Sequence, residues 1–273
     1  MKNISLHIRA EKTLDIAFDK AKLLDLNFFQ CFLLDAKTKK YFDLNNLTVN
    51  HILKTYRKSF KDLIFHGSYF INMTQEKYDE LFNLKKELLM AQKLEFTHGI
   101  FHPGSKFNLS VEQARNRLVK NLNIISKNFP QLTIIIENSA HGGNAFGSDL
   151  SDFEGLFKNI DFPEKIKFCI DTAHAYSFGY DISNEEGQKE FFELLNQIFL
   201  KDQIGLIHLN DTDVILGQKI DRHVIPGHGN IGSENLKKII KNELFQNVPI
   251  ILELPDIEIE NEKMLLNEIR NWF

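Results

Sequence analysis

Nine side chains that can bind a metal ion follow apolar runs along this sequence. They are His66, His102, Glu137, Asp171, His174, His208, Asp221, His223 and Glu253. Histidine nitrogens and carboxylate oxygens are common ligands of zinc-like ions, and one such ion usually takes about four of them. The set therefore predicts a centre of two or three divalent ions, an arrangement typical of phosphoester cleavage.

Most of these residues lie at or near the end of a run that reads as a buried β-strand. The predicted strands are Ile4–Ile8, Phe28–Leu33, Leu63–His66, Thr97–His102, Thr133–Asn138, Ile166–Asp171, Ile204–Asn210 and Val248–Leu254. Continuous apolar strands, each followed by a segment with helical spacing, predict a parallel sheet covered by helices.

The length of the chain favours one particular α/β fold. Its 273 residues are close to the roughly 250 of a (β/α)8 TIM barrel, and we expect a single domain over residues 1–273. No Gly-rich turn follows the first predicted strand, so a dinucleotide-binding fold has no support. Active sites of TIM barrels lie at the carboxyl ends of the strands, where these candidate ligands fall.

Helix starts are predicted at three positions. Ser110 has Gln113 three residues later, the pattern of a capping box, whereas Thr74 and Ser233 predict simple caps.

The net charge, the apolar runs and the cysteines of the chain limit which other classes of function are possible. The formal charge of −4 excludes a generally basic surface for nucleic acid, although three bound divalent ions would reverse its sign. No run reaches the ~18 apolar residues of a membrane span, and charges interrupt the N-terminal apolar patches, unlike a signal peptide. Cys31 and Cys169 lie in strand-like runs, where we expect buried reduced thiols instead of a disulfide or a ligand pair. These features favour a reducing compartment and a cytoplasmic protein.

Two short motifs bring candidate ligands together, and each has a second interpretation. Asp171 and His174 are three residues apart at a strand exit, where one turn brings both to one pocket, but a capping Asp beside a surface His has the same pattern. Asp221 and His223 are two residues apart and point the same way in extended backbone, as in a solvated loop.

Carboxylates that follow apolar runs need partners. Glu137 and Glu253 each follow such a run, and a buried carboxylate is costly unless opposite charge compensates it. An ion pair with Lys or Arg is the alternative to a metal ion here.

The stretches around these residues resemble the endonuclease IV family of apurinic/apyrimidinic endonucleases. The resemblance begins at His7 and covers residues 66–72, 101–105, 137–140, 171–181, 207–211, 221–223, 227–232 and 251–255. It implies a TIM barrel with three Zn²⁺ ions, for which Mn²⁺ is a possible substitute. By the family pattern, the first ion is bound by His66, His102 and Glu137, the second by Glu137, Asp171, His208 and Glu253, and the third by His174, Asp221 and His223.

The same resemblance implies a reaction and its substrate. A zinc-bound hydroxide, oriented by the catalytic carboxylates Glu137 and Glu253, hydrolyses the phosphodiester 5′ to an abasic site in duplex DNA. The products are a 3′-hydroxyl and a 5′-deoxyribose phosphate, and blocked 3′ ends are also trimmed.

The DNA contacts follow from the same comparison of residues. Tyr69 matches the family's intercalating tyrosine, and Lys37 stands nearest to an arginine of the loop after the second strand. His7 and Arg222 are further expected contacts to the DNA. Nothing in the sequence indicates a subunit interface, so we expect a monomer.

Two other functions stay open from the sequence. A sugar isomerase or epimerase on the same barrel typically uses one or two ions bound by fewer, mostly acidic residues, which leaves the His66/His102 and Asp221/His223 pairs without a use. A non-catalytic DNA-lesion binder would keep the zinc ions for structure alone. Cleavage that is lost in Glu253→Gln while lesion binding survives would separate the endonuclease from this binder.

Overall fold

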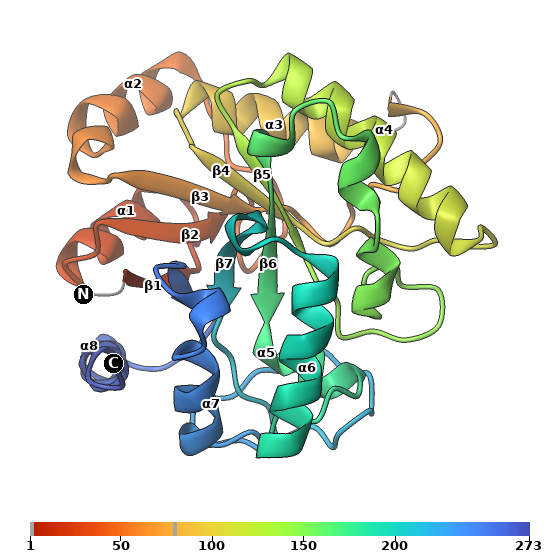
Figure 1. The fold of residues 1–273 in the computed structure, drawn as a ribbon. Helices are drawn as coiled ribbons and strands as arrows, with labels where there is room; N and C mark the ends of the chain where they lie inside the picture. Colours follow the sequence, from red (N-terminus) through yellow and green to blue (C-terminus); the bar gives the residue numbers. More distant parts are fainter. Residues whose placement is uncertain (1–2, 79–80) are drawn as a thin grey trace.

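The strands form a closed parallel barrel in the computed structural model, which describes residues 3–78 and 81–273 (Figure 1). In chain order they are β1 (Ile4–Ile8), β2 (Phe28–Phe32), β3 (Asp62–His66), β4 (His98–Phe101), β5 (Thr133–Glu137), β6 (Ile166–Asp171), β7 (Ile204–His208) and β8 (Ile250–Leu252). Each strand pairs in parallel with the next, and β8 returns to β1. The prediction of a TIM barrel is confirmed.

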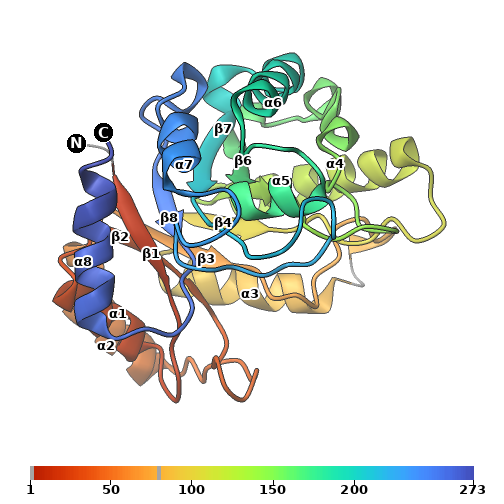
Figure 2. The same ribbon diagram turned by 90° about the horizontal axis from the view of Figure 1, so that it is seen from below.

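Helices surround the barrel, as Figures 1 and 2 show. They are α1 (Asp15–Leu23), α2 (Asn46–Thr55), α3 (Phe82–Lys93), α4 (Val111–Asn128), α5 (Thr172–Phe178), α6 (Glu185–Ile198), α7 (Ser233–Ile240) and α8 (Ile259–Arg270). The last helix packs beside the first, where Lys20 Nζ lies 2.7 Å from Glu262 Oε1. Within the described ranges, no helix has the length and apolarity needed to cross a membrane.

The expectation of a helical segment after every strand is wrong between β5 and β6. The described residues there form 3-10 helices at Leu150–Phe153, Leu156–Asn159 and Pro163–Lys165 in place of an α-helix. Gly155 has a φ of +74°, and Pro163 has no N–H to donate, so neither position continues an α-helix. Further 3-10 helices lie at Arg57–Ser59, Lys201–Gln203 and Glu243–Phe245.

The predicted helix starts have different outcomes. Ser110 caps α4 with the expected capping box, in which its side chain and that of Gln113 each accept the other's backbone N–H. Ser233 is the first residue of α7, one position after the N-cap Gly232. The start at Thr74 is wrong, because α3 begins at Phe82 and the Thr74 hydroxyl instead donates to the Ser105 carbonyl (2.6 Å).

A layer of apolar side chains fills the barrel interior. It consists of Phe28, Ile64, Ile100, Ile135, Cys169, Leu206 and Ile251, one from each strand from β2 to β8. Side chains two residues apart on a strand share a face. The next inward layer toward the carboxyl ends is therefore formed by Gln30, His66, His102, Glu137, Asp171, His208 and Glu253. Strand alternation thus places six candidate ligands above one apolar floor.

A buried carboxylate organises the long segment between β7 and α7, which carries two further candidate ligands. Asp211 is fully buried. Its Oδ2 accepts the backbone N–H groups of Gly227, Gly229 and Gly232 at 2.9–3.2 Å. Its Oδ1 accepts those of its neighbour Thr212 (2.8 Å) and of Ile231 (3.1 Å). One side chain therefore closes a loop of about twenty residues onto the end of β7.

Asp211→Asn should lower the free energy of unfolding by on the order of 3 kcal/mol, because either orientation of the amide turns a donor toward backbone N–H groups. Urea or thermal unfolding measures the change. Asp213→Asn, at an exposed position two residues along, is the matched control and should unfold like the wild type. Equal stability of Asp211→Asn and the control would contradict this role.

Candidate metal centre

The candidate ligands meet at the carboxyl end of the barrel. His66, Glu137, Asp171 and His208 are the last residues of β3, β5, β6 and β7. His102 and Glu253 come one residue after β4 and β8, His174 lies in the first turn of α5, and Asp221 and His223 lie in the loop that Asp211 closes. The expected position at the strand ends is therefore the observed one.

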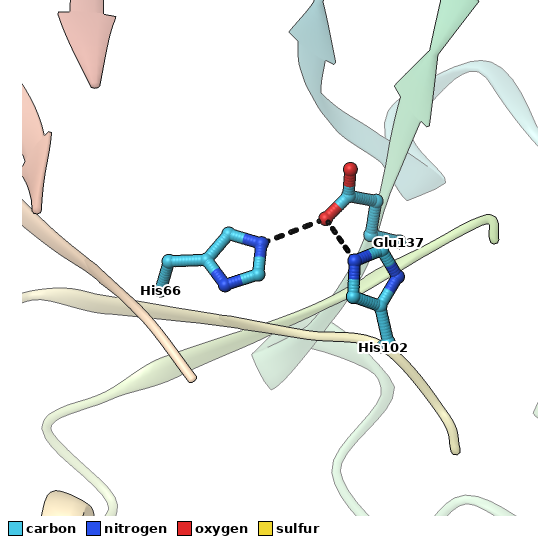
Figure 3. A group of neighbouring side chains, drawn as sticks. All are labelled: His66, His102 and Glu137. Carbon is cyan, nitrogen blue, oxygen red and sulfur yellow. Dashed lines mark hydrogen bonds and ion pairs between the residues drawn. The ribbon is translucent and has the colours of Figure 1, made fainter. Parts of the chain in front are cut away.

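Glu137 lies at the centre of the group and is fully buried. Figure 3 shows its Oε2 facing His66 Nε2 (3.0 Å) and His102 Nε2 (3.6 Å). Its Oε1 faces His208 Nδ1 (2.8 Å) and His174 Nδ1 (3.4 Å). Among the described residues, the ion pairs of Glu137 are with histidines and none is with Lys or Arg. The alternative of a buried pair with a basic side chain does not describe this carboxylate.

The ligand atoms of eight of the nine predicted residues fall into three overlapping groups, within each of which the atoms lie within 4.8 Å of one another. They are His66 with His102 and Glu137, Glu137 with Asp171, His208 and Glu253, and Asp171 with His174 and His223. Asp221 adjoins the third group, since its Oδ1 lies 3.2 Å from His174 Nε2 and 3.5 Å from His223 Nε2. The Nε2 atoms of His174 and His223 approach to 3.2 Å. Facing imidazole nitrogens with a carboxylate oxygen beside both fit a shared zinc-like ion.

The pKa values of these side chains depend on the charges of their neighbours in the group. Burial alone raises the pKa of Glu137, but the His208 and His102 rings outweigh burial and lower it well below its ordinary value. Burial opposes protonation of His174, yet the Asp171 and Asp221 carboxylates raise its pKa well above the ordinary value. Burial lowers the pKa of His102 to about 4. The metal-free group therefore combines carboxylate anions with protonated and neutral imidazoles.

Backbone carbonyls fix the orientation of two rings. His66 Nδ1 donates to the Gly67 carbonyl (2.8 Å), which leaves Nε2 to face Glu137. His174 Nδ1 lies 3.0 Å from the Asn138 carbonyl, and its Nε2 faces Asp221. Such bonds set the tautomer of metal-binding histidines. The donor types, the ring orientations and the burial together fit a polynuclear zinc-like centre.

A cavity of about 330 Å³ opens above this group. Three of the four expected DNA contacts line it, namely His7, Tyr69 and Arg222. Tyr69 is 71% exposed and lies against the Phe32 ring, while Arg222 Nε donates to Asp213 (2.6 Å). Lys37, on the loop after β2, is exposed and is not among the residues that line the cavity.

Several polar residues around the centre were absent from the sequence prediction. Gln30 and Asn210 donate side-chain hydrogen bonds to Glu253 and Asp171, respectively. The signal for Gln30 was present, because it is the one amide in the apolar run Phe28–Phe32 and falls on the inward face.

The two cysteines are buried free thiols, as expected. Cys169 lies close to Glu137 and His208, so it is a potential ligand, although the sequence favours a buried thiol over a ligand role for the two cysteines. Burial raises the pKa of its thiol to about 12, so Cys169 is protonated beside the metal-free centre.

Comparison with known proteins agrees with this architecture. The chain matches the xylose isomerase-like TIM barrel family over residues 18–273. It is 36% identical over 227 residues to the probable endonuclease 4 of Thermosipho melanesiensis, covering 81% of this chain and 78% of that protein. The probable endonuclease 4 of Halothermothrix orenii is 30% identical over 271 residues, covering 93% and 96%.

A solved structure extends the likeness to three dimensions. The crystal structure of endonuclease IV from Thermus thermophilus matches with a TM-score of 0.79 and 25% identity, over 99% of this chain and 98% of that chain. The sequence relatives and this structure agree, and the chain belongs to the endonuclease IV family.

Proposed function

We propose that this member of the endonuclease IV family, a metal-dependent DNA-repair endonuclease, hydrolyses the phosphodiester 5′ to an abasic site in duplex DNA. The P–O3′ bond breaks, and the products are a 3′-hydroxyl and a 5′-deoxyribose phosphate. Trimming of blocked 3′ ends is the same reaction at a strand terminus. The observation that carries the proposal is that Glu137 belongs to two groups of ligand atoms that lie beneath an open cavity.

The nine candidate ligands accommodate three Zn²⁺ ions, with Mn²⁺ as a substitute. His66, His102 and Glu137 would hold one, and Glu137, Asp171, His208 and Glu253 would hold a second. His174, Asp221 and His223 would hold the third, with Asp171 close by. Bound divalent ions supply a nucleophilic water at neutral pH and neutralise the charge of the phosphodiester.

The protein's own carboxylates orient the attacking water. Glu253 lines the cavity, and its Oε1 accepts a hydrogen bond from Gln30 Nε2 (2.7 Å) and lies 3.1 Å from His7 Nδ1. Its Oε2 faces the interior of the centre, 3.7 Å from His208 Nδ1. Glu137, on the opposite side, is fixed by four imidazoles. Both carboxylates are anionic in this setting, so each can accept a hydrogen bond from water.

The rim of the cavity supplies the grip on DNA. An abasic nucleotide has no stacked base, so turning it out of the duplex costs less than for an intact nucleotide. Tyr69 lines the cavity and is 71% exposed, and we expect it to enter the gap left in the duplex. Arg222 is the expected phosphate contact, and His7 lines the cavity, where we expect it to contact the substrate. Lys37, on the loop after β2, is the counterpart of the family's inserting arginine.

One chain supplies the whole centre, which supports action as a monomer. The two buried free thiols, Cys31 and Cys169, suit a reducing compartment such as the cytoplasm.

The direct test uses an end-labelled duplex that contains one abasic-site analogue. The purified protein should incise 5′ to the lesion, and metal analysis should give close to three ions per chain. Prolonged chelation should abolish incision, and Zn²⁺ or Mn²⁺ should restore it. A protein that holds its full metal complement without incising would contradict the endonuclease and favour a lesion binder or a small-sugar substrate.

Glu253→Gln should lower the incision rate by about 100-fold or more, because the neutral amide is a poorer ligand and no longer accepts a proton from water. Lesion binding, measured by fluorescence anisotropy, should change little. Glu260→Gln, an exposed position at the start of α8, is the matched control. Loss of binding in parallel with cleavage would argue against a catalytic role for Glu253.

Metal uptake should release protons at neutral pH. Burial disfavours the charged rings of His174 and His208. The Asp171 and Asp221 carboxylates outweigh burial at His174, and groups that include the Glu253 and Glu137 carboxylates outweigh it at His208. Both pKa values therefore lie well above the ordinary value, and both rings are protonated in the metal-free protein. A metal ion requires an unprotonated ring nitrogen, so affinity should rise with pH. Titration calorimetry in two buffers with different heats of ionisation measures the released protons. Heats that do not depend on the buffer would refute the prediction.

A further inference from the structure

Gln30 lies among the candidate ligands without being one of them. It is the third residue of β2, is fully buried, and occupies the inward layer that also holds His208 and Glu253. A buried amide is costly unless its polar atoms are hydrogen-bonded, so the partners of Gln30 decide what it contributes.

The amide joins two ligands of the same proposed ion. Its Nε2 lies 2.7 Å from Glu253 Oε1, and its Oε1 lies 2.9 Å from His208 Nε2. A carboxylate only accepts hydrogen bonds, so the NH₂ group must face Glu253. The carbonyl oxygen consequently faces His208, where it requires an N–H on Nε2. The carboxylate thus determines the orientation of the amide, and the amide determines the tautomer of the ring.

The opposite ring nitrogen of His208 faces the centre. His208 Nδ1 lies 2.8 Å from Glu137 Oε1, 3.8 Å from Asp171 Oδ2 and 3.7 Å from Glu253 Oε2. When a proton occupies Nε2, the lone pair of a neutral ring is on Nδ1, among three carboxylates. This is the nitrogen that a metal ion in the second group needs.

We propose that Gln30 is a positioning residue of the metal centre. It selects Nδ1 of His208 as the ligand atom and holds Glu253 Oε1 so that Oε2 turns toward the same ion. The proposal rests on the metal assignment of the proposed function. Hydrogen-bond partners of this kind typically change metal affinity by about 10- to 100-fold when they are removed.

His7 completes the arrangement on the other side of Glu253. Its Nδ1 lies 3.1 Å from Glu253 Oε1 and 2.6 Å from Gln30 Nε2. Because the NH₂ group of Gln30 donates, His7 Nδ1 accepts from it and has no hydrogen for the carboxylate, so the hydrogen bond to Glu253 Oε1 comes from Gln30. Gln30 therefore connects His7, Glu253 and His208, and its removal releases two candidate ligands of the same ion.

The test compares Gln30→Leu with Gln188→Leu in the metal-loaded full-length protein. Gln188 is also a buried glutamine, and its Nε2 donates to the Ile182 carbonyl (2.9 Å) and to Asn235 (3.1 Å), away from the candidate ligands. Both variants lose buried side-chain hydrogen bonds and should melt at a lower temperature. A chromogenic chelator then records how many ions leave each protein and how fast.

Gln30→Leu should release one ion about 10- to 100-fold faster than the wild type, while the remaining ions leave at the wild-type rate. Gln188→Leu should release every ion at the wild-type rate. Equal release from Gln30→Leu and the wild type would overturn the proposal, as would equally accelerated release from both variants, which would reflect general destabilisation.

The incision assay distinguishes failure of this inference from failure of the proposed function. Wild-type protein that holds its ions but does not incise abasic DNA, together with selective loss of one ion from Gln30→Leu, would overturn the proposed reaction and support the role of Gln30. Wild-type protein that incises, with unchanged ion release in Gln30→Leu, would overturn only the role of Gln30.

Discussion

Compensation of buried negative charge is the constraint on which the mouth of the barrel depends. Glu137 and Asp171 have no exposed surface, and a carboxylate taken out of water is costly unless positive charge lies beside it. In the metal-free protein, protonated rings such as His174 provide that charge. On the proposed assignment, divalent ions take the place of these protons. Metal binding, protonation and stability of this region are therefore aspects of one equilibrium.

Strand alternation explains how much of this centre could be predicted from the sequence. The apolar runs indicated the strands, and a polar residue at or near the end of most runs indicated the inward layer at the carboxyl end. Glu137 after three isoleucines and His208 after Leu206 and Ile207 are clear examples. The same period places Gln30 in this layer, but an amide is not one of the residue types that commonly bind zinc-like ions, so a search for ligands does not find it.

Parts outside the strands were harder to predict because distant contacts determine them. The positions of Asp221 and His223 depend on Asp211, whose carboxylate collects backbone N–H groups from as far along the chain as Gly232. No residue spacing within the loop predicts that the Asp211 carboxylate will close it. Thr74 has the residue type of a helix cap, but the nearby Ser105 carbonyl provides a tertiary partner that the sequence does not reveal. Local propensity gives way to tertiary hydrogen bonds in both cases.

The negative net charge of the chain bears on how it would meet a polyanion. At a formal charge of −4, the protein as a whole repels DNA, but salt screens charges beyond about 8 Å, so the local surface decides. Near the cavity, Arg9 and Arg222 are paired with Asp256 and Asp213 and leave little excess positive charge. Three divalent ions would outweigh the net charge of the whole chain. On the proposed function, the ions therefore provide both the reactive centre and the positive surface that receives the phosphate.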